Sequence, residues 1–428
     1  MGFTNQIILK KGMTNMKKRL LSTFLTICMA VCSLFVLAGC KSDVNNFSMA
    51  GVKDNGGIGA IKGNYYYYMV GATADRKLTK DNWGRTGIYK VLLDENGNIA
   101  GEPEVVINTL CGYKEGSIAI FGDYIYFVTP SQQSSSSASI LTDRTSFCRV
   151  KTDGTGYKVI YSTETSSTLT YAYYHVSDED LFIACKEGNK LYTINVSSKN
   201  PKPIVISENV SSAVFADNNG IGENANKYIF YTEEPAKNFV TQLGHNVYKV
   251  EPGKTKGELL SSSKDITLVG VKVDYLYYQI GEIMYRTKAV GGLSSNEVVT
   301  YAKYDKYLLL NDGGMVFIDS TAGETWYINW NGGTMEKRCL IGSTNYSLLA
   351  VSNGTLYTKY TDNKIYKVSL SETRQTPKAV TSDTIEELAD NLKCKVVGDK
   401  ICYFVKEVVT SDDGKETTWY NLKWADIN

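Results

Sequence analysis

The sequence of 428 residues predicts an all-β protein, specifically a β-propeller with eight blades. Tyrosine occurs 31 times and proline only seven times, and the tyrosines fall in short clusters rather than at helical spacing. A unit made of an apolar-aromatic strand, a turn and a second strand repeats along the chain at intervals of 40 to 59 residues. An interval of this size accommodates one four-stranded propeller blade.

Eight copies of the unit follow one another. The clearest copy has one strand at Gly122–Val128, a second at Phe147–Val150 and a turn at Lys151–Gly156. β-Branched and aromatic residues, punctuated by Gly, Asp and Asn, favour strands throughout. In chain order, the copies are marked by Tyr65, Tyr124, Leu181, Tyr228, Tyr275, Met315, Thr355 and Ile401. A further strand precedes these markers, as in Ser117–Phe121, Thr267–Val271 and Tyr346–Val351.

Stacking such sheets around an axis covers both of their apolar faces, which no single sheet could bury alone. Repeated tyrosines at one place in each blade are therefore expected in the packing between blades. The last unit stops at Asn428, just after its third strand. Asn46–Ala50 precedes the first full unit, and we expect it to supply the missing fourth strand and close the ring. A seven-bladed ring with one irregular unit is the alternative.

The repeated pattern Asp-x-Ile-Tyr-Tyr, Leu-Tyr-Arg/Lys-Val and Asp-Gly resembles the DUF5050-type propeller repeats of bacterial surface proteins. It is more distantly similar to the YWTD blades of lipoprotein receptors. The resemblance covers residues from about 60 to 428 and is best in units one, two and five. It implies a propeller, and it carries no functional residue over to this chain.

The N-terminus has the organisation of a secretory signal. Lys17, Lys18 and Arg19 precede an apolar stretch of about 17 residues, at the lower limit for spanning a bilayer. The stretch ends in Leu37-Ala38-Gly39-Cys40, which looks like the lipobox of a bacterial lipoprotein. This resemblance implies cleavage after residue 39 and lipidation of Cys40, whose two acyl chains would hold the protein stably on a membrane. An uncleaved membrane span is the alternative.

The expected organisation is a signal peptide at 1–39, a lipidated cysteine and tether at 40–55, and the propeller at 56–428. Residues 1–15 are a possible upstream extension, because Met16 directly precedes the basic region. Cleavage removes five cations and no acid, which changes the formal net charge from +1 to −4. A slightly acidic chain is a poor candidate for nucleic-acid binding, which depends on clustered Lys and Arg. We expect the protein at the outer face of the cell membrane.

Six cysteines remain outside the signal and the lipidation site, and they form no CxxC pair or dense framework. We expect most of them to be buried free thiols that pack as small hydrophobic groups. Cys394 and Cys402 flank a turn at Gly398-Asp399, and a symmetric hairpin about that turn pairs Cys402 with Lys395 instead of Cys394. The six are Cys111, Cys148, Cys185, Cys339, Cys394 and Cys402.

Three stretches depart from the repeat, at Ala72–Gly87, Ser131–Arg144 and Glu233–His245. All three fall between the second and third strands of a unit, so they emerge on the same face of a propeller. Loops on a rigid scaffold are where binding usually occurs. The candidate binding residues are Arg76, Trp83 and Arg85; ordinary solvated loops are the alternative. At Ser382–Leu392 we expect a helical turn between blades, capped by Asp383 and Glu386.

The sequence offers little recognisable chemistry. His175 lies in an aromatic strand and is expected to be structural, while His245 has no ligand partner at metal spacing. Asp94–Asn98 and Ser411–Gly414 contain oxygens suited to calcium, but Asp-Gly and Asn-Gly are also what tight turns require. No nucleophile, P-loop or zinc-protease motif occurs. We predict no cofactor, metal or catalytic residue.

These observations favour a lipid-anchored binding or scaffold module that recognises a protein, peptide or glycan through loops on one propeller face. The alternative is a glycan-acting enzyme that relies on carboxylates alone. The two differ in whether two or more acids with strongly perturbed pKa values converge at the central channel of the propeller.

Overall fold

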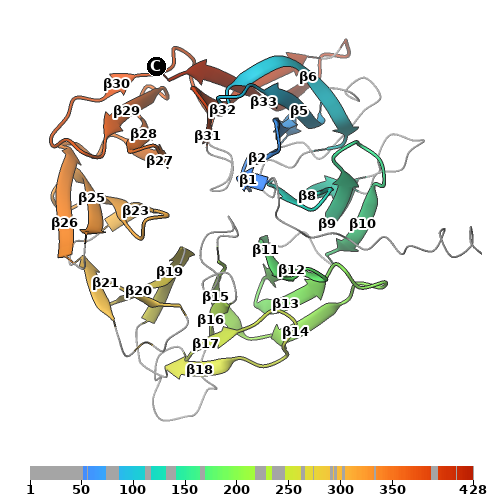
Figure 1. The fold of residues 1–428 in the computed structure, drawn as a ribbon, viewed down its shortest axis with the longest axis horizontal. Coiled ribbons are helices and arrows are strands. Elements are labelled where there is room, and N and C mark those ends of the chain that lie inside the picture. Colours follow the sequence, from blue (N-terminus) through green and yellow to red (C-terminus); the bar gives the residue numbers. More distant parts are fainter. Residues whose placement is uncertain are drawn as a thin grey trace, which may run out of the picture. The chain divides into compact units, whose positions relative to one another are not determined.

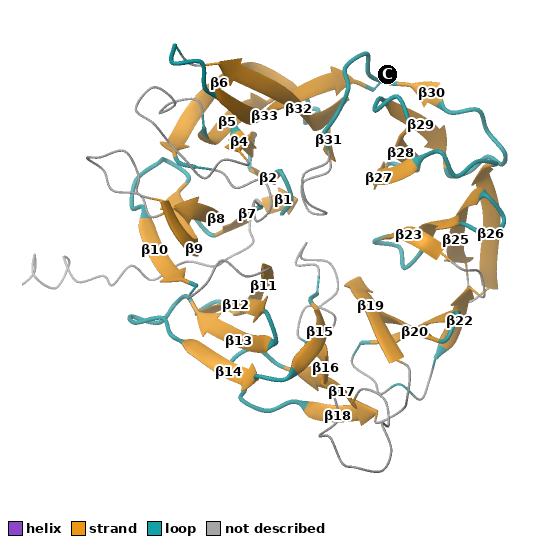
Figure 2. Ribbon diagram, turned by 180° about the vertical axis from the view of Figure 1, so that it is seen from behind, coloured by secondary structure: helices purple, strands orange, loops and turns teal. Residues whose placement is uncertain are grey.

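The computed structural model describes residues 52–54, 56–73, 86–110, 117–131, 141–163, 169–216, 228–233, 246–261, 266–272, 274–289, 293, 296–300, 304–331, 334–386, 394–410 and 412–427. These residues form strands and loops and no helix (Figure 2). They belong to a compact unit, Asn46–Asn428, in which eight antiparallel sheets follow one another in chain order around a common axis (Figure 1). The chain is therefore a β-propeller with eight blades, as predicted, rather than seven.

Each blade is a meander of neighbouring strands. The first sheet contains β1 (Val52–Asp54), β2 (Gly59–Lys62), β3 (Tyr65–Val70), β5 (Gly87–Leu93) and β6 (Ile99–Asn108). The second contains β7 (Ile118–Phe121), β8 (Tyr124–Ser131), β9 (Leu141–Lys151) and β10 (Lys158–Ser162). The third contains β11 (Leu169–Ser177), β12 (Asp180–Glu187), β13 (Lys190–Asn195) and β14 (Pro203–Ser207). The fourth contains β15 (Val210–Val214), β16 (Ile229–Glu233), β17 (Asn246–Val250) and β18 (Glu258–Ser261).

The remaining four sheets continue the same order. The fifth contains β19 (Ile266–Lys272), β20 (Tyr275–Ile280), β21 (Ile283–Lys288) and β22 (Glu297–Thr300). The sixth contains β23 (Tyr304–Leu309), β24 (Met315–Asp319), β25 (Glu324–Asn331) and β26 (Thr334–Ile341). The seventh contains β27 (Ser347–Ser352), β28 (Thr355–Lys359), β29 (Ile365–Ser369) and β30 (Lys378–Ala379). The eighth contains β31 (Cys394–Val397), β32 (Lys400–Thr410), β33 (Glu416–Asp426) and the distant β4 (Ala72–Thr73).

The repeat markers of the sequence lie at or next to the start of the second strand of every blade, when the strands of the five-stranded first sheet are counted from β2. Tyr65 begins β3, Thr355 begins β28, and Ile401 is the second residue of β32. These strands are the most buried, as expected for residues packed between two neighbouring sheets. Tyrosines two residues after the markers, such as Tyr67, Tyr126 and Tyr277, are buried, which confirms that they are core residues.

The hydrophobic core is divided among the contacts between neighbouring blades. Six buried clusters join the blades in succession: one spans the eighth, first and second sheets, and the others continue to the contact between the seventh and eighth. In the first cluster, Tyr66 and Met69 of β3 pack with Phe404 of β32. The first and last blades therefore bury apolar surface against each other, although they come from opposite ends of the described chain.

A tyrosine, a cation and a glutamate recur across the strands of several blades. In the fifth sheet, Arg286 on β21 lies over the ring of Tyr275 at 4.2 Å and donates to Glu297 on β22 at 2.7 Å. Register explains the repetition, because Arg286 stands directly opposite Glu297 and diagonally to Tyr275. Equivalent sets are Tyr65, Lys90 and Glu104 in the first sheet and Tyr228, Lys249 and Glu258 in the fourth. The Tyr and Lys/Arg of the sequence repeat are thus a cation–π pair.

Polar contacts also join the first and last blades. Lys395 Nζ on β31 donates to the backbone oxygens of Gly56 at 2.8 Å and Gly59 at 2.5 Å. The turn after β31 contacts the turn between β5 and β6, where the Asp399 amide donates to Asn98 Oδ1 at 3.0 Å. Lys395 pairs with Cys402 across this hairpin, which confirms the predicted register.

The strand that completes the eighth sheet differs from the one expected. β4, a two-residue continuation of the chain just beyond β3, pairs with β33 through Ala72 opposite Tyr420 and Thr73 opposite Trp419. Asn46–Ala50, the segment predicted to close the ring, lies outside the described residues, so its role is still a prediction. β1 pairs with β2 at the inner edge of the first sheet, within the residues expected to form a tether.

The connection between the seventh and eighth blades does not begin as the predicted helical turn. Residues 382–386 are irregular, and Glu386 forms an antiparallel bridge with Phe404. The Asp383 carboxylate accepts from the Tyr403 hydroxyl at 3.1 Å instead of capping a helix. Strand β32 of the eighth sheet bonds these polar groups instead, so the predicted capping box is wrong for the described residues. Residues 387–392 lie outside them.

The five described cysteines are free thiols, and four of them are buried: Cys148, Cys185, Cys339 and Cys402. Cys394 is half-buried, and Cys111 lies outside the described residues. Burial raises the pKa values of Cys148 and Cys402 to about 12. These groups are therefore neutral packing residues at neutral pH.

Candidate functional site

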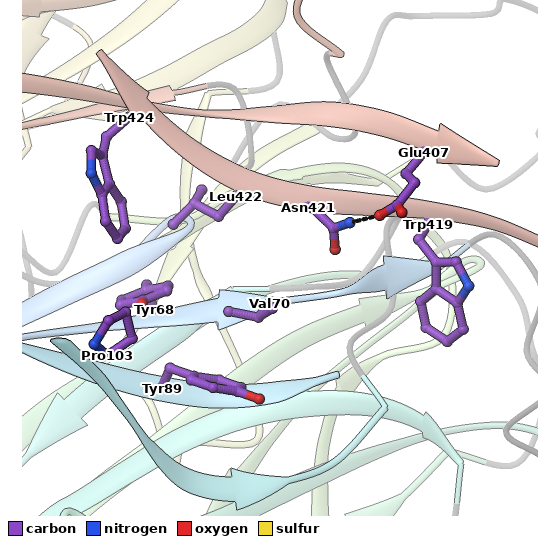
Figure 3. A pocket seen from close by; sticks show the side chains of 9 residues that line it. All are labelled: Tyr68, Val70, Tyr89, Pro103, Glu407, Trp419, Asn421, Leu422 and Trp424. Atoms are coloured by element: carbon purple, nitrogen blue, oxygen red, sulfur yellow. Dashed lines mark hydrogen bonds between the residues drawn. The ribbon is translucent and has the colours of Figure 1, made fainter. Parts of the chain in front are cut away.

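A groove of about 480 Å³ lies between the eighth and first blades. One wall comes from β32 and β33 and the other from β3, β5 and β6 (Figure 3). Its size falls within the range of about 300–1,000 Å³ that is typical of ligand pockets. The lining residues are Tyr68, Val70, Tyr89, Pro103, Glu407, Trp419, Asn421, Leu422 and Trp424.

Four of the nine lining side chains are aromatic. Tyr68 and Trp419 are almost fully buried, whereas Tyr89 and Trp424 are half-buried. The rings of Tyr68 and Trp424 meet edge to face, with centroids 5.9 Å apart, and the Tyr89 ring lies 6.3 Å from that of Tyr68. Burial raises the pKa of Tyr68 well above its ordinary value, so its hydroxyl is neutral at physiological pH. This part of the groove is therefore aromatic and uncharged.

The polar groups of the groove lie on the wall formed by the eighth blade. The amide of Asn421 on β33 donates to the Glu407 carboxylate on β32, and Figure 3 shows this contact above the ring of Tyr89. Glu407 is exposed and is the only charged side chain among the nine lining residues. The groove thus combines ring faces with one carboxylate and one amide, a combination that can bind a ligand having apolar groups and hydrogen-bond donors.

The binding residues expected from the sequence, Arg76, Trp83 and Arg85, lie outside the described residues, and so do Cys40 and His245. The three irregular stretches leave equivalent places in their sheets, between β3 and β5, β8 and β9, and β16 and β17. Their central parts, 74–85, 132–140 and 234–245, are not described. The expectation that these loops form one binding rim is still a prediction.

His175 lies in β11 opposite Leu181, half-buried, with its ring 6.2 Å from that of Phe121. Burial lowers the pKa of this imidazole, while the nearby Asp178 opposes that effect. An aromatic neighbour and partial burial agree with the structural role expected for this residue. Among the described residues, no group of three or more His, Cys, Asp or Glu side chains is placed to hold a metal ion.

The turn at Asp94–Asn98 uses its polar groups internally. Asp94 Oδ1 accepts from the backbone amides of Asn96 at 2.9 Å and Asn98 at 2.8 Å. These hydrogen bonds lower the pKa of Asp94, and Gly97 has a φ of 82°. The carboxylate therefore stabilises a tight turn, as the turn interpretation requires.

The groove was not apparent from the sequence. Tyr68 and Trp424 meet only when the last blade packs beside the first, and local sequence patterns carry no information about that contact. One signal was available: β32 and β33 form a hairpin of 11 residues on each side, longer than the second and third strands of the other blades as a pair. The hairpin carries polar residues such as the exposed Glu407 together with large aromatic residues such as Trp424.

None of the described residues forms a helix with the length and apolar character needed to cross a bilayer.

A search of protein-family models and of curated protein sequences finds no match to the chain. Solved propeller structures are similar at low identity. A post-proline cleaving enzyme from Rickettsia typhi aligns with a TM-score of 0.48 and 11% identity over 85% of this chain, which spans 57% of that enzyme. The β-propeller domain of the Trilobed protease from Pyrococcus furiosus aligns with a TM-score of 0.43 and 11% identity, covering 74% of this chain and 97% of that domain.

The WD40 domain of SCAP from fission yeast aligns with a TM-score of 0.41 and 7% identity, covering 79% of this chain and 92% of that domain. Identities this low concern the fold alone, because propellers serve many unrelated functions. The activities in these names belong to those proteins.

Proposed function

We propose that this chain is a lipid-anchored, extracytoplasmic β-propeller that binds a protein, peptide or glycan on the cell surface. The observation that carries the binding role is the groove between the eighth and first blades, with its four aromatic rings and the pair Glu407 and Asn421. Aromatic rings supply large, rigid contact area, and a few polar groups fix the orientation of the ligand. The anchor rests on the sequence alone, on the lipobox that ends at Cys40.

Binding is favoured over hydrolysis of a glycan by the chemistry of the groove. Carboxylate-dependent glycosidases use two carboxyl groups that flank the scissile bond. Glu407 is the only carboxylate among the residues that line the groove. The groove therefore lacks the second carboxyl group that such an enzyme needs, and a binding module is the function that this site supports best.

The binding role is tested with the full-length chain in detergent, titrated with panels of oligosaccharides and short peptides while tryptophan fluorescence is followed. Tyr89→Ala removes one ring of the groove. Tyr285→Ala is the matched control, because Tyr285 packs on Tyr278 in the fifth blade as Tyr89 packs on Tyr68 in the first. We expect a ligand whose affinity falls about tenfold in Tyr89→Ala and is unchanged in Tyr285→Ala. Equal effects of the two variants contradict a binding role for the groove.

The anchor is tested separately by fatty-acid labelling in cells and by partition into detergent. Cys40→Ser is expected to abolish labelling and to release the chain from membranes, because the thiol that would carry the lipid is gone. Cys32→Ser, which changes a cysteine inside the apolar segment, is expected to retain both properties. Labelling that persists in Cys40→Ser contradicts the lipid anchor.

A further inference from the structure

The groove lies along the outer edge of β33. Trp419 and Asn421 project from one face of this strand, and Leu422 and Trp424 project from the other, because successive side chains alternate in a strand. All four nevertheless line the same groove. A space that is reached from both faces of one strand lies beside its edge. The opposite edge is paired with β32 along its whole length, from Lys400 to Thr410.

This edge is only partly covered in the described part of the chain. β4 pairs with Trp419 and Tyr420, and no described strand pairs with residues 421–426 on that side. In the first blade the corresponding fourth strand, β6, has ten residues. An uncovered edge presents backbone N–H and C=O groups that are a template for one more strand. β4 demonstrates that an antiparallel strand fits this edge.

We propose that the outer edge of β33 binds an extended, cationic peptide segment of another protein, which pairs as a strand beyond β4 and completes the eighth blade. This inference rests on the proposed binding function and names its ligand class. Strand addition supplies affinity through backbone hydrogen bonds and specificity through side-chain pockets. An oligosaccharide would use the aromatic rings but would leave the strand edge unpaired.

The negative charge of Glu407 favours a peptide with basic side chains. Glu407 is exposed beside Asn421 and is the only charged residue among those that line the groove. A Lys or Arg of the peptide would pair with this carboxylate and lie near the half-buried rings of Tyr89 and Trp424. Apolar peptide side chains at alternate positions would face Val70 and Leu422.

The described start of the chain lies away from this edge. β1 begins at the inner edge of the first sheet, whereas the open position lies at the outer edge of the eighth.

In the test, peptides that bind the full-length chain in detergent are selected from a displayed library of random short peptides. Pro103→Trp fills the groove from an exposed position on β6, and Met335→Trp is its control on β26, the outer strand of the sixth blade. We expect peptides that bind the unmodified chain and Met335→Trp alike and bind Pro103→Trp at least about tenfold more weakly. Hydrogen exchange at 421–426 is expected to slow on binding, and methylation of alternate peptide amides is expected to abolish binding.

A second pair of variants tests whether the charge of Glu407 contributes to peptide binding. Glu407→Lys is expected to weaken the selected peptides about tenfold, while Glu416→Lys on the same hairpin leaves them unchanged. The proposal is overturned if no selected peptide distinguishes Pro103→Trp from Met335→Trp. It is also overturned if peptides bind only after residues 41–50 are deleted, which would identify the N-terminal segment as the occupant. Oligosaccharide binding that depends on Tyr89, with no peptide binding, overturns the peptide but leaves the proposed binding function standing.

Discussion

The guanidinium carbon of Arg286 lies 3.4 Å from the centroid of the Trp330 ring. Arg286 is on β21 and Trp330 is on β25, so this stack joins the fifth blade to the sixth. Arg286 also packs on Tyr275, pairs with Glu297 and donates to the Gly313 carbonyl at 2.9 Å. Only 4% of Arg286 is exposed, so the cation is held by rings and hydrogen bonds rather than by water.

Replacement of Arg286 is expected to destabilise the propeller. Arg286→Ala should lower the free energy of unfolding by about 3 kcal/mol, because it removes a buried stack, leaves Glu297 without its cation and leaves the Gly313 carbonyl with the Tyr277 hydroxyl as its remaining donor. Arg286→Lys keeps the charge but loses the planar stack, and should cost about 1–2 kcal/mol. Urea unfolding of the full chain measures both. Arg338→Ala, at a pair that is 35% and 40% exposed, is the control and should cost less than about 1 kcal/mol. A lysine variant as stable as the parent contradicts the stacking role.

Gly398 tests the contact between the first and last blades. Its φ is +59°, and an added Cβ would lie 2.5 Å from Asn98 Oδ1 and 2.6 Å from the Gly97 carbonyl oxygen. Gly281 has the same φ of +59° but nothing within 4 Å of the added Cβ. Both alanine variants incur about 1 kcal/mol of backbone strain, and Gly398→Ala should lose a further 1–2 kcal/mol, roughly, from the clash. Thermal or urea unfolding compares them. Equal losses would contradict a tight contact between the turn at Gly398 and the turn at Gly97-Asn98.

The buried thiols should resist alkylation in the folded protein. The pKa values of Cys148 and Cys402 are raised to about 12 by burial, so only about one thiol in 10,000 is ionised at about pH 8. Among the five described cysteines, Cys394 is half-buried and should react first. Mass spectrometry after timed iodoacetamide treatment resolves the sites, and urea-unfolded chain serves as the reference in which all of them react. Labelling of Cys402 as fast as that of Cys394 would contradict this burial.

The buried tyrosines should make the fold sensitive to alkali. Tyr126 and Tyr277 are fully buried, and desolvation raises the pKa of each to about 12, compared with about 10 in an unfolded chain. Below pH 10 both states are neutral and the full stability is present. Between about pH 10 and 12 the unfolded state ionises first, so stability falls as the pH rises. Urea midpoints measured at rising pH, together with tyrosinate absorbance, follow this loss. A constant midpoint up to about pH 11 would contradict it.

Much of the fold is predictable because propeller blades are built from local repeats. The markers from Tyr65 to Ile401 coincide with the second strands, and the turn at Gly398-Asp399 sets the pairing of Lys395 with Cys402. Strand alternation and tight turns depend on neighbouring residues, so a single sequence reveals them. The helical turn expected to begin near Asp383 does not form there, because the eighth sheet bonds the Asp383 carboxylate and the Glu386 backbone. A local capping motif carries no information about such contacts.

The sequence by itself determined the propeller class, the identity of the buried strands and the expectation of a lipid anchor at Cys40, because each depends on residues close together in the chain. It left eight and seven blades open, and the eight sheets of the structure decide between them. Only the tertiary structure decided that β4 pairs with β33 and that Tyr68 and Trp424 share a groove. These contacts join the two ends of the described chain. Packing geometry and the edge of one strand create the groove, and neither leaves a periodic pattern in the sequence.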